Sequence, residues 1–313
     1  MRVLITGARG FVGSNAVKHY QEKMADIVLW GRKNTSVHGL SASGVDLFDY
    51  QSVLKSLSAA EPDLIIHCAG SANVGRSIED PIKDLNDNYI TVHNILFAMN
   101  QLGLLNCRFV FLSSAAVYGN PTALPISETA PLHPLSPYAL HKLSAEECCR
   151  FAAENYGIDV KILRVFSAYG PGLKKQIFWD MYRKVVETGK LELYGTGNES
   201  RDYVYIDDLI QAIHLIAHVA PKEELIYNVG NGKEIRIREV AEIFASHLNL
   251  GEERIRFNGV VREGDPLNWC ADIQKLAGLG YRQAMDLDKG ISMYISWADK
   301  QYKKDISSAA NRP

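Results

Sequence analysis

The stretch Val3-Leu4-Ile5-Thr6-Gly7-Ala8-Arg9-Gly10-Phe11-Val12-Gly13 decides how this chain folds. Its apolar start predicts a buried first strand, and a helical pattern follows from about Val12 to Met24. Gly7 permits a tight turn, Gly10 lets a diphosphate approach the amino end of the helix, and Gly13 lets helix and strand pack closely. The residues of this turn are therefore predicted to bind a dinucleotide: Gly7, Arg9, Gly10, Phe11, Val12 and Gly13.

Short apolar strands alternate with amphipathic helices through the first half of the chain. Strands are predicted at residues 3–5, 27–30, 64–66, 108–112 and 160–163, and helices at 12–24, 53–58, 88–102 and 138–155. This alternation is typical of an α/β fold with a doubly wound, Rossmann-type parallel sheet, which binds ligands beyond the carboxyl ends of its strands.

The alternation breaks at Gly170-Pro171-Gly172. We therefore predict a dinucleotide-binding domain over residues 1–168 and a smaller mixed substrate domain over residues 169–298, from which strands can return to the first sheet. Residues 299–313 are polar and are expected to form a loosely ordered tail.

Composition excludes several classes of protein. With 47% hydrophobic and 22% charged residues, the chain is a soluble globular type, and its net charge of −2 argues against nucleic-acid and membrane partners. The five cysteines are irregularly spaced and predict reduced thiols and no metal site. No apolar run reaches membrane-spanning length and a strand begins at once, so a cytoplasmic protein is expected. The histidines that show no metal-ligand spacing are predicted to be structural or surface residues: His67, His141, His214, His218 and His247.

The end of the second strand indicates which dinucleotide binds. An NAD site commonly has an acid there for the ribose 2′-hydroxyl, but this chain has Trp30-Gly31-Arg32-Lys33-Asn34. Arg32 and Arg9 suit a 2′-phosphate, which favours NADP(H), while NAD stays open. Asp46 and Leu47 follow an expected third strand and are predicted to touch the adenine.

A tyrosine and a lysine one helical turn apart form a candidate proton-transfer pair. Ser136 and Pro137 favour a helix start, which places Tyr138 and Lys142 on one face of that helix. The ammonium group is expected to lower the pKa of the phenol. Ser113 and Ser114, past the strand at 108–112, compete for a hydrogen bond to a substrate oxygen.

These motifs, in this order, resemble the extended short-chain dehydrogenase/reductases of the nucleotide-sugar epimerase/dehydratase family, to about Trp297. The further stretches that carry the resemblance are His67-Cys68-Ala69-Gly70, Asn88 to Asn94, Ser114 to Gly119, Arg164 to Gly172, Arg201 to Asp208 and Arg262-Glu263-Gly264-Asp265.

The resemblance implies a role for each matching residue. Ser114 would hold the reacting sugar oxygen, Tyr138 would be the acid/base, and Lys142 would lower its pKa and hold the nicotinamide ribose. Asn88 would be a structural or proton-relay residue, and Ala69 would touch the cofactor. The nucleoside-diphosphate sugar would be bound by Ser114, Tyr118, Ser167, Tyr194, Arg201, Arg262 and Asp265.

Two departures narrow the reaction. Ser167 replaces an asparagine that often meets the substrate, and Ala115 and Ala116 replace the acids of members that eliminate water. A 4,6-dehydratase is therefore disfavoured. The favoured function is an NADP(H)-dependent oxidoreductase that reduces C4 of a 4-keto nucleoside-diphosphate sugar. The alternatives are an NAD-dependent 4-epimerase of such sugars and, less favoured, a non-catalytic dinucleotide-binding protein.

The resemblance also implies a homodimer that pairs the helices after Asn88 and Tyr138. Apolar residues expected on their outer faces are Ile95, Leu96, Phe97, Ala145 and Phe151.

Overall fold

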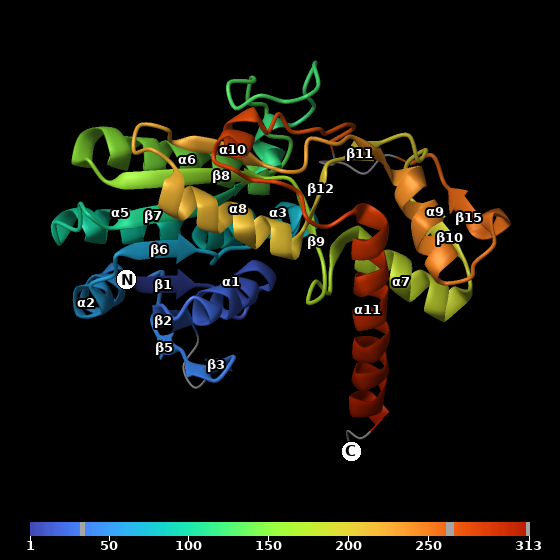
Figure 1. Ribbon diagram of the computed structural model, residues 1–313, viewed down its shortest axis with the longest axis horizontal. Coiled ribbons are helices and arrows are strands. Elements are labelled where there is room, and N and C mark those ends of the chain that lie inside the picture. The colour runs from blue at the N-terminus through green and yellow to red at the C-terminus, as the bar shows by residue number, and fades with distance from the viewer. Residues whose placement is uncertain (32–34, 261–265, 311–313) are drawn as a thin grey trace.

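The computed structural model describes residues 1–31, 35–260 and 266–310. Figure 1 shows the arrangement of its elements. In chain order they are β1 (Arg2–Thr6), α1 (Phe11–Glu22), β2 (Asp26–Gly31), β3 (Ser36–Val37), β4 (Leu40–Ser41), β5 (Ser43–Gly44), α2 (Tyr50–Ala60), β6 (Leu64–His67), α3 (Val74–Glu79), α4 (Pro81–Leu85), the π-helical turn η1 (Asn86–Ile90), α5 (Thr91–Gln101), β7 (Arg108–Ser114), η2 (Ala115–Tyr118), α6 (Pro137–Tyr156), β8 (Asp159–Val165), β9 (Ser167–Tyr169), α7 (Gln176–Thr188), β10 (Leu191–Leu193), β11 (Ser200–Arg201), β12 (Tyr203–Tyr205), α8 (Ile206–Val219), β13 (Ile226–Val229), β14 (Ile235–Arg236), α9 (Ile237–His247), η3 (Glu252–Arg254), β15 (Ile255–Phe257), α10 (Gln274–Gly278) and α11 (Leu287–Ala310).

The predicted doubly wound parallel sheet is confirmed. Its strand order is β13-β8-β7-β6-β1-β2-β5, and each neighbouring pair is parallel. All carboxyl ends therefore lie at one edge of the sheet, where such folds bind ligands. The expected third strand is the short β5, which pairs with β2 at the edge of the sheet.

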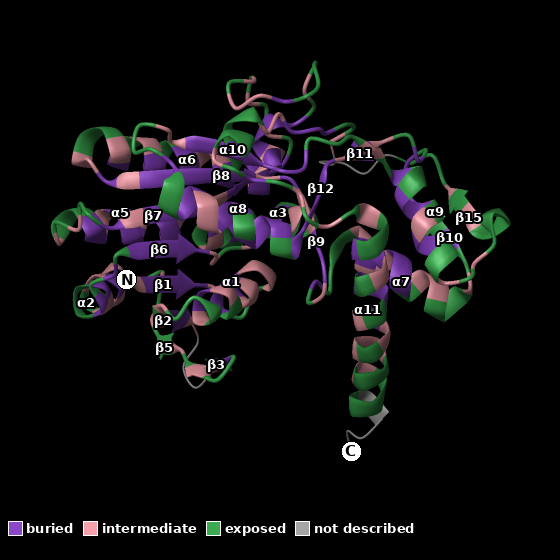
Figure 2. Cartoon of the chain, in the orientation of Figure 1, coloured by how far each residue is buried: buried purple, intermediate pink, exposed green. Residues whose placement is uncertain are grey.

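Both faces of this sheet are covered by helices. Alternate residues of β1 enter different cores: Val3 and Ile5 pack with α1 and α8, whereas Leu4 packs with α2, α5 and α6. All three are fully buried, as Figure 2 shows for the central strands. Because both faces are dry, the strands contain continuous apolar runs in place of an alternating pattern.

The second half of the chain does not form a wholly separate unit. β13 returns to the large sheet beside β8, and α8 packs against α1 over one sheet face. The helix α10 also packs against β13, whereas α7, β10, α9, β15 and α11 form a smaller lobe, in which β10 pairs with β15 and α9 packs against α11 (Figure 1). The carboxyl edge of the sheet faces this lobe, which suits a site built from both parts.

Two regions differ from expectation. From residue 299 to Ala310 the chain continues α11 as a helix in place of a loosely ordered tail, and the Lys174 ammonium group pairs with the Asp305 carboxylate at 2.9 Å. The proposed dimer faces are also partly wrong, because Ile95, Leu96 and Ala145 are fully buried. The helix α5 lies between α2 and α6, and both neighbours cover its apolar residues.

Within the part of the chain that the structure describes, no helix combines the length and the apolar character needed to cross a membrane.

Candidate functional site

The glycine-rich turn after β1 has the geometry of a phosphate-binding turn. Gly7 has φ 62°, and a Cβ added there would lie 2.5 Å from the backbone nitrogen of Ala69. A Cβ on Gly13 would meet the carbonyl oxygen of Gly7. Gly10 caps α1 without a side-chain hydrogen bond and is exposed, so the first N–H groups of the helix stay accessible to an anion. These residues fit a dinucleotide whose diphosphate lies against the backbone.

The other residues predicted for the cofactor lie around this turn. Arg9 is exposed, Phe11 is half-buried, and a Cβ on Gly172 would touch the Phe11 ring at 3.5 Å. At the β2–β5 side of the sheet, Asp46 is exposed, whereas the backbone oxygen of Leu47 accepts a hydrogen bond from Asn94 at 2.9 Å. The predicted phosphate ligand Arg32 lies outside the described residues.

Ser114 and Tyr138 meet at the carboxyl end of β7. Ser114 ends that strand, and Tyr138 lies in the first turn of α6, where the Ser136 hydroxyl accepts a hydrogen bond from the Ala139 N–H at 3.3 Å and Pro137 starts the helix. The Ser114 hydroxyl lies close enough to the Tyr138 phenol to lower its pKa, and Tyr138 is 7% exposed. A nearly buried pair of hydroxyls is therefore available to one substrate oxygen.

The pKa of Tyr138 differs from expectation. Burial raises the pKa to about 12, with a smaller lowering by the neighbouring Ser114 hydroxyl and a further rise from the charge of Asp84. The expected lowering of this pKa by Lys142 is therefore wrong for the chain alone, because desolvation of the phenolate is the largest effect.

Lys142 lies one turn further along α6 and is 6% exposed. Its Nζ donates a hydrogen bond to the backbone oxygen of Leu112 at 2.8 Å and lies 4.8 Å from the centre of the Phe111 ring. Burial lowers the pKa of this ammonium group to about 8, against the raising effect of Asp84. Lys142 is thus still an ammonium group at neutral pH, but with a pKa well below that of an exposed lysine.

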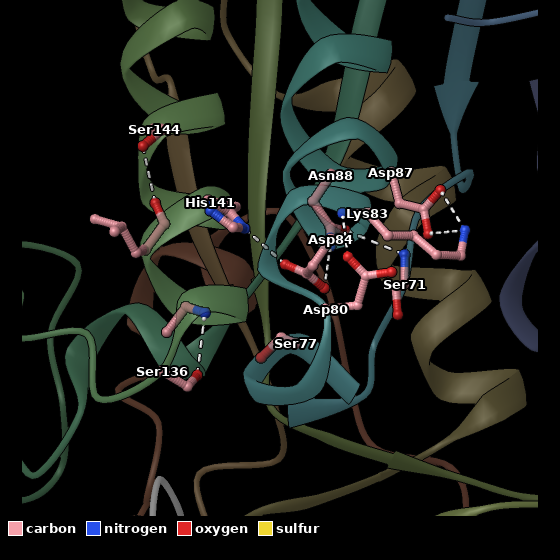
Figure 3. Close-up of polar contacts among 12 residues, drawn as sticks. Ser71, Ser77, Asp80, Lys83, Asp84, Asp87, Asn88, Ser136, His141 and Ser144 are labelled. Carbon is pink, nitrogen blue, oxygen red and sulfur yellow. Dashed lines mark hydrogen bonds and ion pairs between the residues drawn. The ribbon is translucent and has the colours of Figure 1, made fainter. Parts of the chain in front are cut away.

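Asn88 lies in the π-helical turn between α4 and α5, and it is 1% exposed. Such turns are frequent at functional sites. Its Nδ2 donates to Asp84 Oδ1 at 3.0 Å, and its Oδ1 accepts from the Ser71 N–H at 3.2 Å. Figure 3 shows these contacts together with the pair between His141 and Asp84.

The structure separates the two candidate serines. Ser113 is 4% exposed, and its hydroxyl donates to Glu146 at 2.5 Å. Glu146 also binds the guanidinium of Arg164, whose Nη1 donates to the Tyr118 hydroxyl at 3.0 Å. Ser113 therefore belongs to a buried network under the site, whereas Ser114 faces Tyr138.

Tyr118 belongs to that same network. It is fully buried, and its hydroxyl donates to Asn228 Oδ1 at 2.7 Å. Its hydroxyl therefore lies in the core beneath the site, away from the surface that a sugar could touch.

Residues predicted for the substrate come from both parts of the chain. Ser167 is half-buried and lies two residues past Val165, which pairs with Ser114. Arg201 Nη1 donates to the backbone oxygens of Ser200 and Leu267 at 2.8 and 3.1 Å. Tyr194 is 45% exposed in the smaller lobe, and the predicted ligands Arg262 and Asp265 lie outside the described residues.

Three residues of the site escaped the sequence reasoning. Asp84 lies four residues before Asn88, and His141, which was expected to be structural or at the surface, joins it at 2.8 Å. Two features of the sequence could have pointed to them. Asp84 lies one helical turn before Asn88, and His141 lies between Tyr138 and Lys142 in the sequence. Trp269 packs its ring 5.5 Å from the Arg201 guanidinium and helps to line a small apolar hollow with Ala116.

Comparison with known proteins agrees with this geometry. Residues 3–230 match the model of the NAD dependent epimerase/dehydratase family. A putative UDP-glucose 4-epimerase of Methanocaldococcus jannaschii is 32% identical over 305 residues, 94% of this chain and 97% of that one.

Solved structures resemble the chain over nearly its whole length. The UDP-glucose 4-epimerase of Thermus thermophilus, in complex with NAD, has a TM-score of 0.85 and 28% identity, covering 96% of this chain and 99% of that one. The dTDP-glucose 4,6-dehydratase of Streptomyces venezuelae, with NAD bound, has a TM-score of 0.86 and 26% identity, covering 97% and 98%. The matched segment includes the glycine-rich turn, the large sheet, and Ser114, Tyr138 and Lys142. The chain therefore belongs to the NAD dependent epimerase/dehydratase family.

Proposed function

We propose that this protein is an NAD-dependent 4-epimerase of a uridine-diphosphate hexose. The observation that carries the proposal is the neighbouring hydroxyls of Ser114 and Tyr138 with Lys142 one turn away, at the edge where a dinucleotide site fits. Relatives described as UDP-glucose 4-epimerases support the substrate, and relatives solved with NAD support that cofactor in place of NADP(H).

The residues after Ser114 support epimerisation over elimination of water. Ala115 and Ala116 carry only methyl groups, so neither position offers a general acid to a leaving hydroxyl. Epimerisation needs no such acid, because no group leaves the sugar. The site therefore offers hydroxyl groups for proton transfer at C4, beside the turn that suits a dinucleotide, and lacks an acid at these two positions.

The chain's own residues would move the proton. When bound, oxidised NAD supplies a hydride acceptor and a positive charge, which lowers the pKa of a neighbouring phenol. Tyr138 then removes the proton from the C4 hydroxyl and later returns it, while Ser114 holds the same oxygen. Lys142 would keep a positive charge near this pair and would hold the nicotinamide ribose.

The test begins with the purified protein without added cofactor. It is denatured, the released dinucleotide is identified by mass, and the native protein is assayed for interconversion of UDP-glucose and UDP-galactose. About one equivalent of retained NAD and interconversion without added cofactor are expected. An empty protein that oxidises NADPH with a 4-keto nucleotide sugar would overturn the proposal in favour of the reductase.

A pair of tyrosine variants on one helix tests the mechanism. Tyr138→Phe is expected to lower turnover by about 10²-fold or more, since it removes the acid/base group. Tyr156→Phe, at the other end of α6, serves as the matched control and should leave turnover unchanged. A loss of less than tenfold in Tyr138→Phe would contradict the assigned role.

A further inference from the structure

One buried carboxylate joins the two helical segments that carry the candidate catalytic residues. Asp84 is 4% exposed; its Oδ1 accepts from Asn88 Nδ2 at 3.0 Å, and its Oδ2 lies 2.8 Å from His141 Nδ1. Figure 3 shows Asn88 and His141 reaching this carboxylate from different helices. Asp84 thereby links the π-helical turn to α6, between Tyr138 and Lys142.

The same contacts extend to the segment after β6. Asn88 Oδ1 accepts from the Ser71 N–H, and a Cβ added to Gly70 would lie 2.8 Å from that oxygen and 3.6 Å from Lys142 Nζ. Asn88 and Lys142 therefore border the same side of Gly70, where a side chain would meet both. A shift of Asn88 would move the Lys142 surroundings with it.

The charges around Lys142 single out Asp84. The titratable groups near Lys142 are those of Asp84, Glu146, Cys149, Cys68 and His67. Burial raises the pKa of both thiols and lowers that of His67, so all three are neutral at neutral pH. Glu146 is already paired with the Arg164 guanidinium at 2.7 Å. Among these described neighbours, Asp84 is thus the carboxylate that is not paired with a buried guanidinium or ammonium group; its partner in the structure is the His141 imidazole.

We propose that Asp84 is a positioning residue for the proposed reaction. Its carboxylate holds Asn88 and His141 in place and supplies the negative charge that keeps Lys142 an ammonium ion. His141 donates from Nδ1 and fixes the carboxylate. The inference rests on the proposed function, which gives Tyr138 and Lys142 their roles in proton transfer.

The decisive variant is Asp84→Asn, which keeps the shape and removes the charge. The charge of Asp84 raises the pKa of both Tyr138 and Lys142, so its removal lowers both. Ionised Tyr138 then forms at lower pH, and protonated Lys142 is lost at lower pH. The whole pH profile of kcat/KM is expected to move to lower pH by about one unit. A purely structural role would reduce kcat/KM and leave the profile where it was.

Two sets of variants separate position from charge. Asp87→Asn, three residues further on, removes a carboxylate that pairs with Lys83 at the surface and should not move the profile. In His141→Asn, the amide nitrogen stands close to the place of Nδ1 and should retain most activity, whereas His141→Leu should lose about tenfold or more. These histidine variants also decide the matter if Asp84→Asn does not fold.

A titration independent of turnover completes the test. The side-chain nitrogen of Lys142 is followed by ¹⁵N NMR and assigned with Lys142→Arg. A midpoint near pH 8 is expected in the wild type and a lower one in Asp84→Asn. If the wild type shows no epimerase activity, the proposed function fails and this titration still tests the charge of Asp84. An unmoved midpoint together with an unmoved profile, or equal activity of the two His141 variants, would overturn the inference.

Discussion

Replacing Glu146 by glutamine should destabilise the fold strongly. Glu146 is fully buried and accepts hydrogen bonds from Arg164 Nε at 3.0 Å and Nη2 at 2.7 Å, and from Ser113. Arg164 is 1% exposed, so Glu146→Gln leaves a buried guanidinium without its counter-charge. Breaking one side of a buried ion pair costs about 3–5 kcal/mol of unfolding free energy.

This cost converts into a measurable shift of the unfolding temperature. For a chain of 313 residues the entropy of unfolding is about 0.66 kcal/mol per kelvin, which predicts a fall in Tm of about 5–8 °C. The assay is urea and thermal unfolding followed by circular dichroism, with the same cofactor content in every sample. Glu147→Gln is the matched control, because Glu147 forms a surface pair with Arg150 worth about 0–1 kcal/mol.

The comparison of adjacent residues makes the result decisive. If the unfolding free energies of Glu146→Gln and Glu147→Gln differ by less than about 1 kcal/mol, the argument from the buried pair is refuted. That result would mean that water or a rearranged neighbour compensates Arg164 in the folded state.

Three other features of the structure give further predictions. Gly13→Ala should reduce the amount of retained dinucleotide at least tenfold, because the added Cβ would meet the Gly7 carbonyl oxygen. In the control Gly278→Ala the added Cβ meets no atom within 4 Å, so the dinucleotide should be retained. Both results are checked by the mass of the released cofactor. Burial lowers the pKa of His67 from 6.5 to about 3, so below pH 6.5 the unfolded chain binds a proton that folded His67 does not. The urea midpoint should therefore fall as the pH drops from 6.5 towards 3, and a midpoint that stays constant would contradict this. Tyr118→Phe should cost about 1–3 kcal/mol of unfolding free energy and leave KM for the sugar nucleotide unchanged, and a tenfold rise in KM would instead place its hydroxyl at the substrate.

The sequence by itself determined the sheet and the place of the cofactor turn. The apolar strands are short and buried on both faces, so their composition is readable without knowing their neighbours. Ser136-Pro137 before Tyr138 and Gly157 after Tyr156 are local start and stop signals, and α6 has these bounds. The order of the motifs also identified the family, because each motif occupies a fixed place relative to a strand or a helix.

Tertiary structure decided which polar residues serve the site. Ser113 and Ser114 are adjacent in sequence, yet Glu146 takes the first and Tyr138 the second. Both partners lie on α6, Tyr138 in its first turn and Glu146 two turns further on, so the packing of α6 against β7 decides which serine meets which partner. Similarly, Tyr118 lies within a motif of the family, but its hydroxyl is bonded to Asn228 in the core.

The pKa of Tyr138 and the role of Asp84 were equally out of reach of the sequence. A Tyr and a Lys at helical spacing suggested a lowered pKa, but the depth of burial reversed the direction. Asp84 and His141 lie 57 residues apart and meet only when α4 packs against α6. Local patterns report which elements form, whereas desolvation and charge pairing depend on which elements come together, and these set the chemistry of the site.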